Sequence, residues 1–109
     1  MLMKVSLPIV EGNAAVANGT LGITVESILG DLKPETVYFA EENGARTAFI
    51  FFNMADSSQI PAVAEPWFLS LNATVEFHPA MNLEDLKNAM PGMESAVRKY
   101  GHGVRAAGA

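Results

Sequence analysis

The sequence predicts an α+β fold in which four antiparallel strands form one sheet and the helices cover one face of it. Three observations support this prediction. Apolar residues alternate at residues 3–10 and 73–81, they recur at helical spacing in two longer segments, and Asn43-Gly44 separates two strand-like arms. The expected order is strand, helix, strand, strand, helix, strand, and then an extra C-terminal helix.

The first strand is expected at residues 3–10, "MKVSLPIV". Val5, Leu7 and Ile9 share one parity and are expected to face the core, because alternate side chains of a strand lie on opposite faces. Pro8 has no N–H to donate to a neighbouring strand, so it is expected at a strand end or a bulge.

Residues 11–32 are expected to form the first helix. The apolar positions that recur at helical spacing are Leu21, Val25, Ile28, Leu29 and Leu32. Three glycines in the earlier part each lower helix propensity by about 1 kcal/mol relative to alanine, so the helix is expected to be firm from about residue 20. Pro34 should end it, because the residue before a proline avoids the helical conformation.

Residues 35–54 are expected to form a β-hairpin. Asn43-Gly44 suits the positive φ angles of a tight type I′ turn. The second arm, residues 47–54, is apolar on both faces, which is typical of a strand covered on both sides.

Residues 55–72 are expected to form the second helix. Asp56 and Gln59 resemble a capping box at its start, and Pro66 is expected to kink its middle. The expected apolar stripe, with Trp67 beside it, is Ile60, Ala64, Phe68 and Leu71.

The fourth strand is expected at residues 73–81, followed by one or two short helices. Asn82 with Asp85 should cap the first of these, Pro91 should start a second, and Gly101 should end it. Residues 1–101 are thus expected to form a single domain, and residues 102–109 a flexible tail.

This order is the split βαβ, or ferredoxin-like, pattern (βαββαβ), which places the first strand between the third and the fourth. The uncovered face of the sheet would carry Lys4, Tyr38, Glu76 and His78. It would also carry aromatic residues of the third strand, either Phe49 and Phe51 or Ile50 and Phe52. Leaving such a patch in water forgoes several kcal/mol at roughly 25 cal/mol per Å². We therefore expect this face to pair with a second copy as a homodimer with an internal cavity.

Composition excludes several classes of function. The net charge is −5, and the 7 Lys and Arg residues are scattered, which argues against nucleic acid and anionic membranes as partners. The chain has no cysteine, so disulfides, thiolate catalysis and Cys-based zinc sites are excluded. No secretory signal is expected, and the protein is expected to be cytoplasmic and to need no cofactor.

Three segments together resemble a known group of proteins: "GTLGITVESILGDLKPETVYF", "NGARTAFIFFNM" and "QIPAVAEPWFLSLNATVEFHPAM". They are similar to small bacterial proteins of the ferredoxin-like, dimeric α+β-barrel superfamily. The resemblance covers about residues 3 to 101. It implies the fold and a dimer, and it also implies a site between sheet and helices or near the barrel mouth. The group carries no established activity, and none of the superfamily's catalytic motifs is matched, so no residue role is transferred.

Two candidate sites follow from the residues. In the first, His78 is a proton shuttle oriented by Glu76, because residues two apart on a strand share a face. Tyr38, Phe51 and Trp67 would line the same cavity. The alternative is that Glu76 and His78 are ordinary interface or surface residues.

The second candidate is a small-molecule cleft between helix and sheet. Glu65, Trp67 and Asn13 would line it. Arg46, just past the expected hairpin turn, is a separate candidate for binding an anion. The alternatives are that Trp67 is a core residue, that Glu65 is solvated, and that Arg46 is an exposed strand-end charge. A metal site is disfavoured, because only two His are present.

The sequence therefore predicts a small-molecule-binding protein or a cofactor-independent enzyme acting on a small organic substrate. The other hypothesis is a non-catalytic dimeric interaction or regulatory module.

Overall fold

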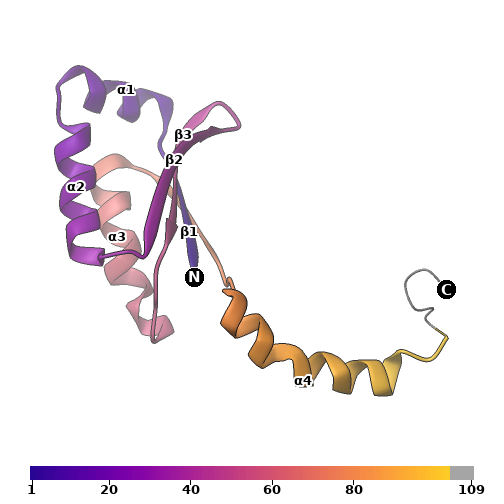
Figure 1. The fold of residues 1–109 in the computed structure, drawn as a ribbon. Coiled ribbons are helices and arrows are strands. Elements are labelled where there is room, and N and C mark those ends of the chain that lie inside the picture. The colour runs from indigo at the N-terminus through magenta and orange to yellow at the C-terminus, as the bar shows by residue number, and fades with distance from the viewer. Residues whose placement is uncertain (104–109) are drawn as a thin grey trace.

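A computed structural model, which describes residues 1–103, has a four-stranded antiparallel sheet and four α-helices. The predicted α+β fold and the ferredoxin-like order are confirmed. Helices α1, α2 and α3 cover one face of the sheet, and α4 extends away from it (Figure 1). The elements are β1 (Leu2–Ser6), α1 (Ile9–Ala17), α2 (Leu21–Leu32), β2 (Thr36–Glu42), β3 (Ala45–Phe51), the 3-10 helix η1 (Ser57–Gln59), α3 (Ile60–Leu71), β4 (Thr74–His78) and α4 (Leu83–Tyr100).

The strand order is β2-β3-β1-β4, so β1 lies between the third and fourth strands as predicted. Lys4 lies opposite Phe49 on one side and opposite Glu76 on the other. Phe49 in turn lies opposite Tyr38. Because residues directly opposite each other share a face, these side chains form one row across the uncovered side of the sheet.

The core lies between the sheet and the three covering helices. Its largest fully buried side chains are those of Met3, Val5, Ile50 and Trp67. The alternation of β1 therefore turns Met3 and Val5 inward and leaves Lys4 outward. On β3, Phe49 and Phe51 face away from the helices, and Ile50 faces them, which settles the alternative that the sequence leaves open.

The first strand is shorter than predicted. It ends at Ser6, and Ile9 is 64% exposed at the start of α1, so the expectation that Ile9 faces the core is wrong. Pro8 causes the change, since it has extended geometry at the N-cap of α1 and provides no N–H for strand pairing. Its carbonyl accepts the first helical hydrogen bond, from Gly12 N at 2.8 Å.

The first helical segment is two helices. The break lies at Asn18-Gly19, where the Asn18 side chain accepts hydrogen bonds from Thr20 N and Thr20 Oγ1 at 3.1 and 2.6 Å. Gly19 has a φ of +76°, which a residue with a Cβ adopts only with strain. The residues before position 20, where the glycines weaken the expectation of a helix, thus form α1.

The β2–β3 turn has the predicted type I′ character. Both central residues have positive φ, 54° at Asn43 and 77° at Gly44, and Gly44 N donates to the Glu41 carboxylate at 2.9 Å. We expect Gly44→Val to lower the free energy of unfolding by about 1–2 kcal/mol, because valine resists left-handed geometry. Urea denaturation would measure the change. Asn43→Gly, which retains the turn, is the control, and an unchanged midpoint for Gly44→Val would contradict the turn geometry.

The start of α3 differs in detail from the expected capping box. Asp56 accepts a hydrogen bond from Ser58 N at 2.8 Å, whereas the Gln59 side chain accepts from Ala55 N at 3.1 Å. The Ser58 backbone bond lowers the pKa of Asp56 below its usual 3.8. The bond therefore stabilises the fold above that pH, and its contribution is lost as the pH falls through the lowered pKa.

Helix α3 buries a face that overlaps the predicted one only in part, since Ala64 and Leu71 are buried as predicted. Ala64, Trp67 and Leu71 are buried, whereas Ile60 and Phe68 are 37% and 42% exposed. The observed buried positions keep spacings of three and four residues, so the stripe is rotated and centres on Trp67. Helix α3 continues through Pro66.

The C-terminal segment is one helix, α4, of 18 residues. Its predicted cap is confirmed: Asn82 accepts from Asp85 N at 2.8 Å, and Asp85 accepts from Asn82 N at 3.1 Å. The expectation that Pro91 starts a second helix is wrong, since α4 runs through it, but Gly101 does end the helix. Of the predicted flexible tail, His102 and Gly103 form a turn, and residues 104–109 lie outside the described residues.

Candidate functional site

The uncovered sheet face carries a charged group at its centre. Lys4 Nζ lies 2.7 Å from Glu42 Oε2 and 3.5 Å from Glu76 Oε2, and the Lys4 side chain is 19% exposed. The hydrogen bond to Glu42 raises the pKa of Lys4 above its usual 10.5. The stability that Lys4 gains from this pairing on the alkaline side is fully present up to pH 10.5 and is lost as the pH rises through the raised pKa.

Glu76 and His78 share this face, as the spacing predicted. The Glu76 carboxylate, however, is directed at Lys4. Among the described residues, no hydrogen bond or ion pair joins His78 to Glu76 or to another side chain. Both are exposed on the edge strand β4. The acid–base pair therefore stays a prediction, and the geometry favours a structural ion pair for Glu76.

A hollow lies on the side of the sheet that the helices cover, and we call it the α2 cleft. It has a volume of about 650 Å³, within the usual range of small-molecule sites. Its walls come from α2, from β2 and β3, and from single residues of neighbouring segments. Its lining includes Leu7, Leu21, Val25, Leu29, Phe39, Arg46 and Trp67. Most of this lining is apolar, and Phe39 is 63% exposed.

Trp67 lines the cleft from α3. It is 1% exposed, and its Nε1 has no hydrogen-bond partner in the described chain. A buried donor without an acceptor costs about 1–3 kcal/mol, and such groups are rare in folded proteins. Trp67 thus contributes to the cleft wall, while its indole N–H is buried in the core.

Arg46 supplies the positive charge in the cleft lining. Its Nη1 donates to Asn13 Oδ1 at 3.0 Å. Across the described residues, no carboxylate lies within ion-pair distance of its guanidinium, although Glu41 lies opposite it in the hairpin. The guanidinium also contacts α1 closely, since a Cβ built on Gly12 would lie 2.9 Å from Arg46 Nη1. The lack of a side chain at Gly12 thus leaves room for Arg46.

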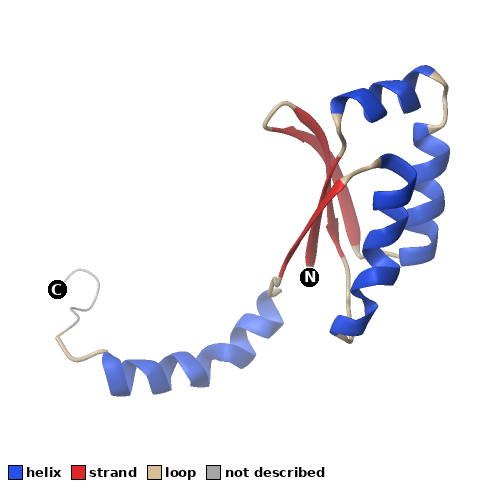
Figure 2. Ribbon diagram, turned by 180° about the vertical axis from the view of Figure 1, so that it is seen from behind, coloured by secondary structure: helices blue, strands red, loops and turns tan. Residues whose placement is uncertain are grey.

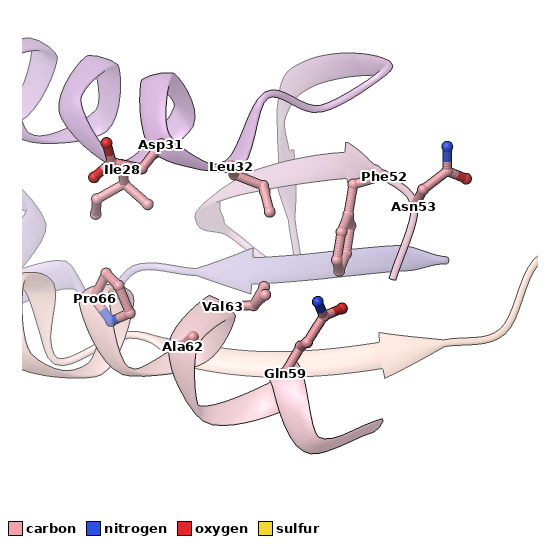
Figure 3. A pocket seen from close by; sticks show the side chains of 9 residues that line it. All are labelled: Ile28, Asp31, Leu32, Phe52, Asn53, Gln59, Ala62, Val63 and Pro66. Carbon is pink, nitrogen blue, oxygen red and sulfur yellow. The ribbon is translucent and has the colours of Figure 1, made fainter. Parts of the chain in front are cut away.

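A second hollow, of about 400 Å³, lies between the end of α2 and the start of α3 (Figure 3). Phe52, Leu32 and Val63 form its apolar lining, and Asn53 points away from it. Gln59 faces the hollow, but its oxygen already accepts the bond from Ala55 N. The lining includes no cation, which makes this hollow a weaker candidate than the α2 cleft.

The sheet separates the predicted site residues into two groups. Arg46 and Trp67 lie together in the α2 cleft, with Asn13 hydrogen-bonded to Arg46. Tyr38, Phe51, Glu76 and His78 lie on the uncovered face, so Trp67 does not share a cavity with them. Glu65 is exposed on α3 and is not part of the cleft lining.

Sequence reasoning missed the wall that α2 and Phe39 contribute. The helical spacing of Leu21, Val25 and Leu29 indicates core positions, yet each is only partly buried. Gly22 could have indicated this wall from the sequence, because a glycine next to Leu21 reduces the bulk of α2 there. Gly22 does line the cleft.

In the described part of the chain, no three His, Asp or Glu residues come close enough to hold a metal ion. None of the described helices has the length and apolar content needed to cross a membrane. Comparison of the chain with protein-family models, curated proteins and solved structures finds no match.

Proposed function

We propose that this protein binds a small organic molecule with an apolar body and an anionic group, such as a monocarboxylate, in the α2 cleft. One observation carries the proposal: the lining of a mostly apolar hollow includes the Arg46 guanidinium, which no carboxylate of the described chain neutralises. Arginine suits carboxylates because its fork matches their geometry.

The apolar lining supplies the affinity in this proposal. Transfer of the ligand's apolar body from water to the cleft is favourable at roughly 25 cal/mol per Å². The Arg46 guanidinium adds selectivity for a carboxylate over a neutral compound of the same length.

The same geometry does not favour acid–base chemistry in this cleft. Among the described residues, its lining includes no His, and Glu26 is its only carboxylate. We therefore propose binding without assigning a reaction. The hypothesis that His78 acts as a proton shuttle keeps its own test: a substrate rate unaffected by His78→Ala would refute it.

Trp67 is the only tryptophan of the chain, so its fluorescence reports directly on the cleft. We expect octanoate to change this fluorescence in a saturable way. Arg46→Met should weaken octanoate binding about tenfold or more, because a charged hydrogen bond contributes roughly 1.5–3 kcal/mol. Binding of neutral octanol should be unchanged. Lys33→Met, which removes another cation, is the matched control.

A second variant tests the position of Arg46 rather than its charge. Gly12→Ala places a methyl group 2.9 Å from the present position of Arg46 Nη1, so the guanidinium must shift. Helix α1 should tolerate the change, since alanine has the higher helix propensity. We expect weaker octanoate binding with unimpaired thermal stability. Equal affinities for octanoate in the wild type, Arg46→Met and Gly12→Ala, or no saturable signal at all, would refute the proposal.

A further inference from the structure

Helix α4 leaves the domain without packing on it. Figures 1 and 2 show it projecting from the end of β4, on the side away from the other helices. None of its residues is buried, although it is 18 residues long, or about 27 Å. Pro91 and Gly92 lower the helix propensity of α4, and most helical stability in proteins comes from packing of an amphipathic face, so α4 needs a partner surface.

The apolar residues of α4 form one continuous stripe. They recur at alternating intervals of three and four: Leu83, Leu86, Met90, Met93, Val97 and Tyr100. This is the a/d pattern of a coiled-coil seam. The charged residues of α4 lie on the other sides of the helix, and Pro91 and Gly92 also lie off the stripe, because each residue turns the helix by about 100°.

We propose that α4 pairs antiparallel with α4 of a second copy. In this arrangement Leu83 packs against Tyr100 of the second copy, Leu86 against its Val97, and Met90 against its Met93. All three pairs share one centre, between positions 91 and 92, so the stripe is complementary to itself. A two-fold symmetric interface requires this property, because the same patch of the two copies must contact itself across the symmetry axis.

The flanking residues support the antiparallel direction. On one side of the stripe lie Lys87 and Glu94, both at the e position of the heptad. Antiparallel helices bring e positions together, so Lys87 of each copy faces Glu94 of the other. On the other side lie Ala89 and Ala96, whose small side chains permit close approach. A parallel pair would instead place Glu94 beside Ala89 and Lys87 beside Asn82, without a charge partner.

The shape of the chain also permits this pairing. The two domains would lie at opposite ends of the helix pair, about 27 Å apart along it, so they do not compete for the same space. The uncovered sheet faces are not needed for the contact. This dimer is therefore distinct from the sheet-to-sheet dimer that the sequence predicted.

Charge reversal in the full-length chain tests the register. We expect analytical ultracentrifugation to show a dimer for the wild type. Lys87→Glu alone and Glu94→Lys alone should each weaken the dimer about tenfold, since each creates two symmetry-related repulsive pairs. The double variant should restore it. Glu84→Lys, on an outer face of α4, is the matched control and should leave the dimer unchanged.

Disulfide formation tests the direction, because the natural chain has no cysteine that could compete. The double variant Leu86→Cys/Val97→Cys should form a covalent dimer with oxidised glutathione, because position 86 of each copy lies next to position 97 of the other. The two positions are about 16 Å apart within one helix, so their thiols cannot bond to each other there. Each single variant should stay uncrosslinked.

Three outcomes would overturn the proposal. Crosslinking of Leu86→Cys alone would show parallel helices. A monomeric wild type would indicate that α4 is covered otherwise, for example by its own sheet. A dimer unaffected by either charge reversal would place the contact on another surface, such as the uncovered sheet face.

Discussion

Trp67→Ala should lower the free energy of unfolding by about 3–5 kcal/mol, the usual cost of truncating a large buried aromatic residue. Trp67 is 1% exposed and belongs to the core cluster of buried residues. A small domain has only about 5–15 kcal/mol of stability, so the variant should unfold at a much lower urea concentration. Far-ultraviolet circular dichroism would follow unfolding, because the tryptophan signal is lost.

Trp67→Phe is the matched variant, since it keeps an aromatic ring and removes the unpartnered N–H. We expect it to destabilise far less than Trp67→Ala, because the phenyl ring fills most of the space that alanine would leave empty. Equal stability losses for Trp67→Ala and Trp67→Phe would show that the ring itself contributes little packing.

Pro91→Ala should slow amide hydrogen exchange in the second half of α4 by about 100-fold. A proline inside a helix removes one backbone hydrogen bond and is about 3 kcal/mol less favourable than alanine. Pro91 is exposed, so the gain should come from the helix itself. Because α4 does not pack on the domain, the exchange of β1 and β3 amides should not change.

Gly92→Ala provides the control for this measurement. A Cβ at Gly92 meets no atom within 4 Å, and the substitution restores no backbone hydrogen bond. It should slow exchange only about fivefold, the equivalent of about 1 kcal/mol of helix propensity. If Pro91→Ala has no more effect than Gly92→Ala, the helix does not depend on the hydrogen bond that Pro91 lacks.

The sheet could be predicted from the sequence because strand alternation is a local property. Val5 and Lys4 differ in polarity and are adjacent, so their faces follow from the two-residue period. The Asn43-Gly44 turn is equally local. Element ends are harder to predict: Pro8 is compatible with a strand end or a bulge, and only its position before Ile9 in the folded chain shows that it begins a helix.

The site could be predicted only in part. The sequence indicates Arg46 and Trp67 as candidates, but their proximity depends on how α2 and α3 pack on the sheet. The contact between Gly12 and Arg46 joins residues far apart in the sequence, and no local sequence pattern predicts it. Pro91 is misleading for the opposite reason, since a local preference for helix starts is overridden by helical residues on both sides.

The extended position of α4 gives the chain a radius of gyration of 19.0 Å, whereas a compact chain of this length has about 13 Å. The helix is attached to the domain only through residues 79–82, so this short segment sets its direction. It acts mechanically as a lever: a rotation of about 10° at that attachment moves its far end by about 5 Å. The spacing and relative orientation of any two domains joined through α4 are therefore fixed by the conformation of this short segment, and Pro79 restricts it at its first residue.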